Sequence, residues 1–329
     1  MSKMSTDLNR HALNGPTMGT RWSALFFMPP GFDPEPVRLA LQAAVEEVDA
    51  QMSTWRPDSA LMRLNAAPVG DRVACASGLI GVLRLGVMIG QASAGAFDIG
   101  LGDAVTAWGF GPDAATPDGI RRAMSATRRP ASETLVFGET EVCKTAPIAL
   151  DLNGIAKGHG VDRLAETLRD HGITQALVGI DGEMRALGLR PDGTPWSIAV
   201  EAPDAGRRSV HSVVTLEDAA IATSGDYRHW VEIGGKRLSH TMDPARGAPL
   251  VASPASVTVV AATCATADAW ATALMVLGVD KGTAKARAHG LDALFLVRKG
   301  DGTVESIGTG PLFGDAAVGA ALWDQGPAA

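Results

Sequence analysis

An aspartate and a threonine in the last third of the chain have the spacing of a cation site. Asp268 and Thr272 are four residues apart in a stretch of small apolar residues, 265–272. If this stretch is a helix, the two side chains share one face. A carboxylate and a hydroxyl on one face can supply half of the oxygen ligands that a hard divalent cation prefers. The alternative is a structural aspartate that is capped or hydrogen-bonded in the core.

A glycine-rich segment, residues 151–162, places Lys157 ahead of a predicted helix. Free backbone N–H groups at a helix N-terminus, together with an ammonium group, suit a phosphate ligand. The alternative is an ordinary N-terminal turn with a solvated lysine.

Residues 223–228 and 239–249 form a third polar region. Tyr227, the only tyrosine of the chain, lies here beside two hydroxyls, a glycine, an aspartate and an arginine. This composition is too polar for a strand that must bury one face. His240 follows a predicted hairpin and precedes the turn at Pro244, so it can point into a cleft; the alternative is a structural histidine. Residues 16–20 and 94–100, the latter followed by 108–111, also gather small and polar residues.

Helical periodicity dominates the first half of the chain. Asp33-Pro34 is a helix start, because proline suits the first helical position. The buried face of that helix is predicted to carry Val37, Leu41, Val45, Val48 and Met52. Further helices are predicted over 77–93, from Thr116, after Gly154 to His171, over 265–277 up to Gly278, and over 280–289. A strand is predicted over 20–28 and a flexible tail over 1–15.

Short apolar runs separated by Gly and Asp turns follow from Gln175. They predict antiparallel hairpins over 176–180, 184–189, 196–200, 209–215, 219–222, 229–233, 237–240, 257–261, 293–297 and 303–308. The predicted class is α+β, with mixed, mostly antiparallel sheets and flanking helices. We expect one catalytic domain over 16–329, with a helix-richer half (16–172) and a strand-richer half (173–329).

Composition and missing motifs exclude several classes of protein. The 329 residues carry 29 Lys and Arg against 36 Asp and Glu, a net charge of −7, which argues against nucleic-acid binding. Cys75, Cys143 and Cys264 are far apart and form no CxxC, so neither a disulfide framework nor a zinc site is expected. The motifs GxGxxG, GxxxxGK[ST], HExxH and GxSxG are absent. Their absence disfavours a Rossmann dehydrogenase, a P-loop enzyme, a zincin and an α/β-hydrolase, respectively.

No segment looks like a membrane span or a secretion signal. No stretch approaches the roughly 20 apolar residues of a span, and the first residues lack the apolar core of a signal peptide. We therefore expect a cytoplasmic protein, or a periplasmic one if a signal has been removed.

Taken in the order in which they occur along the chain, the five segments described above resemble the ApbE family of FAD:protein FMN transferases. The resemblance runs from about Thr17 to about Gly278. It is strongest in Thr-Ser-Gly-Asp-Tyr (223–227), followed by His-x-x-Asp-Pro-x-x-Gly-x-Pro (240–249). Gly-Ile-Ala-Lys-Gly (154–158) and Asp-Ala-x-Ala-Thr (268–272) come next. One departure is Ile-Asp-Gly-Glu (180–183), which stands where Gly-Gly-Asp is common and brings extra negative charge near the expected flavin pocket.

The resemblance implies an ApbE-type, T-fold-like fold and a specific reaction. The FMN moiety of FAD moves to a threonine hydroxyl of an acceptor flavoprotein, forming a phosphoester and releasing AMP. Mg²⁺, or Mn²⁺, is expected to bind the carbonyl of Ala156 and the side chains of Asp268 and Thr272. His240 is expected to be the catalytic base. The residues expected at the flavin nucleotide are Met18, Gly19, Asp98, Lys157, Asp181, Thr223, Ser224, Gly225, Asp226 and Tyr227.

Two alternatives to protein flavinylation stay open from the sequence. The same site could use water as the nucleophile and act as an FAD pyrophosphatase that yields FMN and AMP. The second alternative, from a different class, is a flavin-binding protein without catalytic activity.

Overall fold

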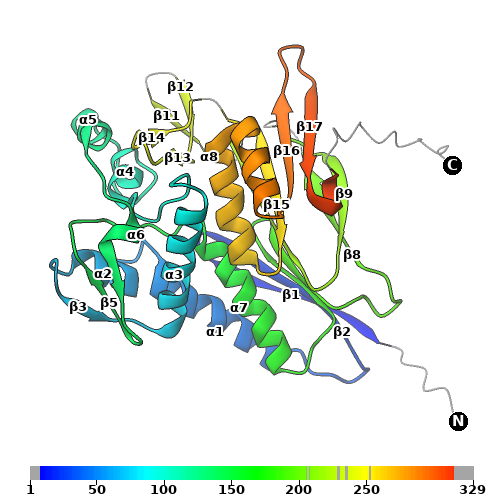
Figure 1. Ribbon diagram of the computed structural model, residues 1–329. Coiled ribbons are helices and arrows are strands. Elements are labelled where there is room, and N and C mark those ends of the chain that lie inside the picture. The colour runs from blue at the N-terminus through cyan, green and yellow to red at the C-terminus, as the bar shows by residue number, and fades with distance from the viewer. Residues whose placement is uncertain are drawn as a thin grey trace, which may run out of the picture.

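An eight-stranded antiparallel sheet forms the centre of the molecule (Figure 1). The computed structural model describes residues 8–204, 206, 208–227, 230–233, 236–251 and 253–314. The strands follow the order β1 (Asn9–Thr17), β2 (Thr20–Met28), β6 (Ala176–Ile180), β7 (Glu183–Leu187), β10 (Ala220–Gly225), β15 (Ser256–Ala261), β16 (Asp292–Arg298) and β17 (Val304–Thr309). The sheet therefore draws on both predicted halves of the chain and joins them into one unit.

Three helices cover one face of this sheet: α1 (Glu35–Met52), α7 (Ala156–Asp170) and α8 (Cys264–Ala288). The predicted apolar face of α1 is confirmed, because all five of its residues are buried. Gly278, with φ of +71°, interrupts α8, which confirms the predicted end of one helix there and the start of another. Glycine adopts this left-handed conformation without the steric cost of a Cβ atom.

The other face of the sheet is covered by the hairpin of β8 (Trp196–Glu201) and β9 (Val210–Leu216). Trp196, Ile198 and Val200 alternate along β8 and are buried with Leu296 of the sheet. This alternation is that of a strand with one buried face.

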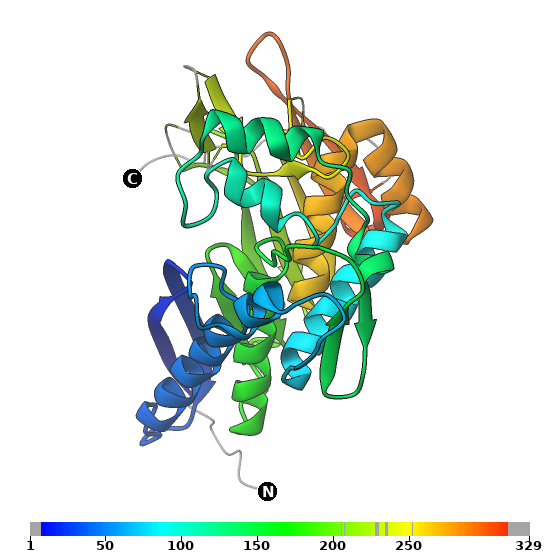
Figure 2. The ribbon, with the colours of Figure 1, turned by 90° about the vertical axis from the view of Figure 1, so that its left-hand side faces the viewer.

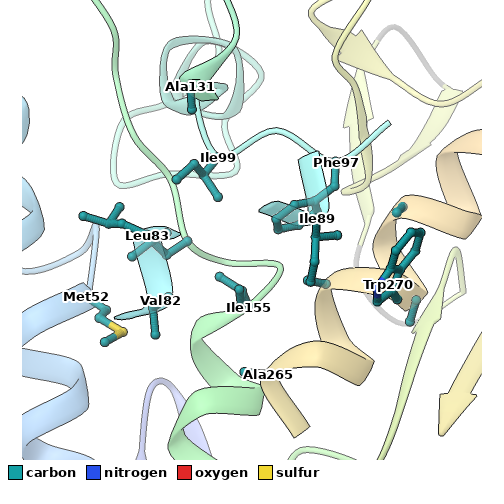
Figure 3. Close-up of a cluster of buried hydrophobic side chains, with 14 of the residues drawn as sticks. Met52, Val82, Leu83, Ile89, Phe97, Ile99, Ala131, Ile155, Ala265 and Trp270 are labelled. Carbon is teal, nitrogen blue, oxygen red and sulfur yellow. The ribbon is translucent and has the colours of Figure 1, made fainter. Parts of the chain in front are cut away.

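A smaller lobe packs beside the helices. It contains α2 (Ala60–Ala66), α3 (Ser77–Ala92), α6 (Ala131–Thr134) and a three-stranded sheet of β3 (Arg72–Ala74), β5 (Glu141–Lys144) and β4 (Leu135–Phe137). Figure 3 shows where this lobe meets α8: Val82, Leu83 and Ile89 of α3 lie in one buried cluster with Trp270. The cluster joins the lobe to the helical layer.

Two short helices, α4 (Gly102–Ala107) and α5 (Pro117–Ser125), lie above this lobe in Figure 2. Thr116 caps α5 as predicted, since its Oγ1 accepts the N–H of Gly119 at 3.1 Å. The indole of Trp108 donates to the carbonyl of Gly247 at 2.9 Å, and this ties α4 to the hairpin of β13 (Met242–Asp243) and β14 (Ala248–Pro249). The hairpin of β11 (Trp230–Ile233) and β12 (Lys236–Ser239) precedes it, and α9 (Gly310–Phe313) follows β17.

The α+β class is confirmed, but two local predictions were wrong. Residues 9–15 are no tail, because they belong to β1, which pairs with β2 along its length; residues 1–7 lie outside the described part. Gly15 suggests a turn in sequence, yet a Cβ here would lie 2.6 Å from Nε1 of Trp22. The glycine therefore leaves room for the hydrogen bond between that indole and Gln42, which measures 2.8 Å.

The second wrong prediction concerns residues 223–225. They were expected to be too polar for a strand, but they complete β10. Their side chains lie where the strand runs into a cleft, so they need not bury an apolar face. Within the described residues, no helix has the length and apolarity that crossing a membrane requires.

Candidate active site

A cleft of about 1470 Å³ brings the predicted segments together. Its walls come from the β1–β2 turn, residues 96–110, the start of α7, the β6–β7 turn, the β8–β9 hairpin, β10, residues 240–244 and α8. The predicted residues that line it are Met18, Gly19, Asp98, Lys157, Asp181, Thr223, Ser224, Gly225, Tyr227, His240, Asp268 and Thr272. A volume above the usual few hundred to about 1000 Å³ leaves room for a large ligand.

Met18 and Gly19 form the two-residue turn between β1 and β2. Their φ angles are +44° and +72°, and Thr17 pairs directly with Thr20 across the turn. Positive φ at both central residues is the requirement of a type I′ hairpin turn. The turn holds the Met18 side chain against Gly160, where an added Cβ would lie 2.9 Å from the methionine methyl group.

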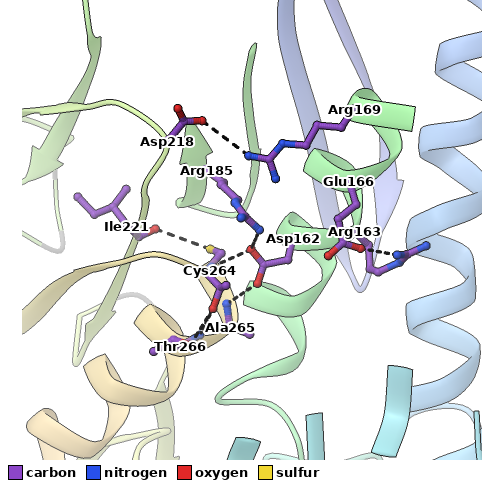
Figure 4. A network of polar contacts seen from close by, with 11 residues as sticks. Asp162, Arg163, Glu166, Arg169, Arg185, Asp218, Ile221, Cys264, Ala265 and Thr266 are labelled. Atoms are coloured by element: carbon purple, nitrogen blue, oxygen red, sulfur yellow. Dashed lines mark hydrogen bonds and ion pairs between the residues drawn. The ribbon is translucent and has the colours of Figure 1, made fainter. Parts of the chain in front are cut away.

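The first turns of α7 and α8 meet at the floor of the cleft. The backbone N–H of Gly158 donates to Oδ2 of Asp268 at 3.1 Å. A Cβ on Gly158 would lie 2.5 Å from the carbonyl oxygen of Cys264, so only glycine permits this approach. Figure 4 shows the contacts behind it, in which Asp162 of α7 accepts the N–H groups of Cys264 and Ala265 at 2.8 and 2.9 Å.

Two of the three predicted cation ligands line the cleft. They are Asp268 and Thr272, which are predicted to share a helix face. Asp268 is buried, and Thr272 Oγ1 lies 3.2 Å from Ser224 Oγ. Ala156 is the first residue of α7 and is not among the lining residues. No group of three or more His, Cys, Asp or Glu side chains is arranged for a metal among the described residues; the predicted set includes a single carboxylate.

A second carboxyl group lies beside Asp268. Glu183 begins β7 and is buried, and its Oε2 has no hydrogen-bond partner. Burial, followed by the charge of Asp268, raises the pKa of Glu183 to about 8. Burial also raises the pKa of Asp268 to about 6, although the Gly158 N–H and Lys157 oppose the shift. A buried carboxyl oxygen without a partner beside a second carboxylate is a setting that a hard cation would stabilise, so these residues suit a divalent ion.

Lys157 brings a positive charge to the cleft floor. Its Nζ lies 2.7 Å from Oδ2 of Asp181, and the two side chains are 28% and 33% exposed. Burial opposes the charged form of Lys157, but Glu183, Asp181 and Asp268 outweigh burial and raise its pKa. The ammonium group is therefore positively charged, and Lys157 is among the residues that line the cleft.

Several predicted contact residues are also held by the protein itself. Oδ1 of Asp98 accepts the N–H groups of Gly100 at 2.8 Å and Ala131 at 3.2 Å; burial still raises its pKa. Thr223 Oγ1 lies 2.8 Å from Thr258 Oγ1 on the neighbouring strand. These contacts fix the side chains at the cleft wall.

Asp226 is the one predicted nucleotide contact that does not line the cleft. Both of its carboxylate oxygens accept from the guanidinium of Arg298 at 2.8 Å, and it is not among the residues that line the cleft. Tyr227, the next residue, does line it. The structure thus assigns Asp226 to an ion pair that holds the end of β10 against β16.

His240 follows β12 directly, as the sequence indicated. It is partly buried and lines the cleft together with Thr241, Met242 and Pro244. Its segment is supported by α4, because Met242 lies in a buried cluster with Ala104 and Trp108. The histidine thus lies in the same cleft as Lys157 and Asp268.

The set of predicted site residues missed several that line the cleft. They include Asp151 and Asn153, the aromatic rings of Trp55 and Phe110, and the cations Arg21 and Arg208. Desolvation raises the pKa of Asp151 to about 6 against the opposing N–H of Asn153. Asp151 stood in the glycine-rich segment and could have been found there, whereas Trp55, Arg21 and Arg208 carry no local signal.

Comparison with known proteins gives a consistent result. A sequence model of the ApbE family matches residues 18–295. The chain is similar to the FAD:protein FMN transferase of Vibrio cholerae, with 39% identity over 89% of each chain. That of Escherichia coli K12 is 33% identical and covers 88% of this chain and 84% of its own.

Solved structures agree with the sequence comparison. The flavin transferase ApbE from Vibrio cholerae superposes with a TM-score of 0.80 and 36% identity, over 92% of this chain and 97% of its own. The apo form of the Pseudomonas stutzeri flavinyl transferase ApbE superposes with a TM-score of 0.82 and 35% identity, over 94% of this chain and 98% of its own.

Proposed function

This chain belongs to the ApbE family, and on that premise we propose that it transfers the FMN moiety of FAD to a threonine hydroxyl of an acceptor flavoprotein. The observation that carries this proposal is the single cleft that contains Lys157, Asp268, Thr272 and His240. A phosphate-binding cation, oxygen ligands for a metal ion and a base are the groups that this transfer needs.

The floor of the cleft is the proposed diphosphate site. In this proposal Lys157 would bind a phosphate oxygen of FAD, and Asp268, Thr272 and the carbonyl of Ala156 would hold Mg²⁺; Mn²⁺ prefers the same ligands. When bound, the ion neutralises negative charge on the diphosphate. The flavin nucleotide is placed along Met18, Gly19 and the end of β10. The burial of Asp268 and Glu183 and the unpartnered Oε2 of Glu183 are what support a cation requirement here.

His240 is the proposed base. It removes the proton from the acceptor threonine hydroxyl as the threonine oxygen bonds to the phosphorus of the FMN moiety. The bond between that phosphorus and the bridging oxygen breaks, and AMP leaves with that oxygen. A positioned histidine contributes roughly 10²–10⁴-fold to such a step.

The direct test supplies FAD, Mg²⁺ and a flavoprotein acceptor to the purified protein. We expect fluorescent acceptor in a denaturing gel, one equivalent of AMP, and one added FMN on a threonine by mass spectrometry. An acceptor without its threonine is the control. Unmodified acceptor, with no AMP released, would count against the proposal. Free FMN and AMP formed at the same rate with and without acceptor would instead identify an FAD pyrophosphatase.

A further inference from the structure

Asp181 lies in a two-residue turn at a position that aspartate, asparagine and glycine can all fill. Residues 181 and 182 connect β6 to β7, with Ile180 paired to Glu183. The φ angles of Asp181 and Gly182 are +52° and +107°. Positive φ at both central residues is the requirement of a type I′ turn, for which Asp-Gly, Asn-Gly and Gly-Gly are all preferred. The backbone therefore does not single out aspartate, and what distinguishes it from asparagine or glycine is the contact that its carboxylate makes.

The carboxylate of Asp181 contacts the lysine that faces the cleft. The distance from its Oδ2 to Nζ of Lys157 is 2.7 Å, and each side chain is about two-thirds covered by protein. Lys157 also lies in the field of Glu183 and Asp268. Three carboxyl groups thus act on one ammonium group at the cleft floor, and one of them, Asp181, forms a direct ion pair with it.

This arrangement matters for an anionic ligand. A phosphate group that binds Lys157 must share or displace the Asp181 carboxylate, and like charges at such distances repel. A charge-assisted hydrogen bond in a partly buried site is about twice as strong as a neutral one. The ion pair therefore weakens phosphate binding unless a divalent cation offsets the carboxylates.

We propose that Asp181 is a specificity-determining residue that occupies Lys157 in the free enzyme and makes binding of the nucleotide diphosphate depend on a divalent cation. The proposal rests on the proposed function, because it assumes that the diphosphate of FAD binds at Lys157. It concerns this chain's own Asp181 and not the ligands of the ion.

The test measures FAD affinity by the change in flavin fluorescence, in EDTA and in saturating Mg²⁺. Asp181→Asn and Asp181→Gly both keep a residue that accepts positive φ, so the turn is preserved. In EDTA we expect FAD to bind about tenfold more tightly to both variants than to the wild type. In Mg²⁺ the gain should fall to about twofold or less.

Two controls make the result specific. Asp218→Asn changes an aspartate in a turn of the same handedness, φ +45°, that lies outside the cleft lining, and it should leave FAD affinity unchanged. Riboflavin, which lacks phosphate, should bind the wild type and the Asp181 variants equally. A gain of the same size for riboflavin, or for Asp218→Asn, would overturn the proposal.

A double-mutant cycle tests the route through Lys157. In a Lys157→Met background, Asp181→Asn should give less than half of its gain in the logarithm of affinity, because the group that it releases is gone. An undiminished gain, or equal FAD affinity of Asp181→Asn and the wild type in EDTA, would contradict the role of the ion pair. Failure of every variant to bind FAD even in Mg²⁺ would instead refute the proposed function.

Discussion

The carboxylate of Asp162 in α7 accepts the backbone N–H of Cys264 at 2.8 Å, and this contact fixes the first turn of α8. The same carboxylate accepts the guanidinium of Arg185 from β7 at 2.6 Å. One buried side chain therefore sets the positions of three elements, and Asp268 lies one turn further along α8. The site depends on a group that does not line its cleft.

Removal of this carboxylate should destabilise the fold. Asp162→Ala leaves two N–H groups and the 11% exposed Arg185 without their partner, so we expect a loss of about 3–5 kcal/mol in unfolding free energy. Urea unfolding followed by circular dichroism measures it. The control is Asp170→Ala at the exposed end of the same helix, expected to change the value by under about 0.5 kcal/mol. A loss under about 1 kcal/mol for Asp162→Ala would show that water replaces its contacts.

The close approach of α7 and α8 predicts opposite effects for two glycine substitutions. Gly158→Ala places a Cβ 2.5 Å from the carbonyl oxygen of Cys264 and should destabilise by about 1–3 kcal/mol or more. Gly81→Ala in α3 meets no atom within 4 Å and should stabilise by about 0.5–1 kcal/mol, the helix propensity of alanine over glycine. Thermal unfolding measures both. Equal shifts in the midpoint of thermal unfolding for the two variants would contradict the close approach of α7 to α8.

The raised pKa of Glu183 predicts how stability depends on pH without metal. Its pKa rises from 4.5 to about 8 on folding, so the folded protein binds the proton more tightly than the unfolded chain. The contribution is complete below pH 4.5 and is lost as the pH rises through about 8. We expect unfolding free energy in EDTA to fall between pH 5 and 8, and to fall less in Glu183→Gln. The exposed Glu217→Gln should behave like the wild type; an unchanged slope in Glu183→Gln would place the titration elsewhere.

Loss of the proposed base should separate binding from transfer. His240→Ala should slow covalent flavin transfer about 10²–10⁴-fold while FAD affinity stays within a factor of about two, because the proposed role of the histidine is at the acceptor threonine and not at the nucleotide. Single-turnover transfer and a fluorescence titration measure the two quantities. His171→Ala, at the exposed end of α7, should change neither. Transfer at the wild-type rate would remove His240 from the mechanism.

The proposed metal ligands predict stabilisation by Mg²⁺. At a concentration of about 100 times its dissociation constant, a ligand that binds only the folded state adds about 2.7 kcal/mol to the free energy of unfolding. Asp268→Asn and Thr272→Val should each lose most of this gain, whereas Thr215→Val on an exposed position of β9 should keep it. Retained stabilisation in both ligand variants would place the ion elsewhere.

Elements with a strong local pattern were predictable. Periodicity placed the buried face of α1, and Gly278 marked the break in α8. The first strand was missed because Asn14, Gly15 and Pro16 are turn formers, and only their pairing with β2 makes them a strand. Helix α2 was missed as well, although Ser59 caps it through the N–H of Met62 at 3.1 Å.

The sequence by its local pattern predicted a candidate set of chemical groups, because Asp268 and Thr272 share a helix face and Lys157 lies in the first turn of a helix. Only the tertiary structure decided what surrounds them. Asp181 reaches Lys157 at 2.7 Å, and Glu183 is desolvated beside Asp268. Desolvation and charge pairing depend on neighbours far apart in the chain, and local pattern carries no record of those neighbours.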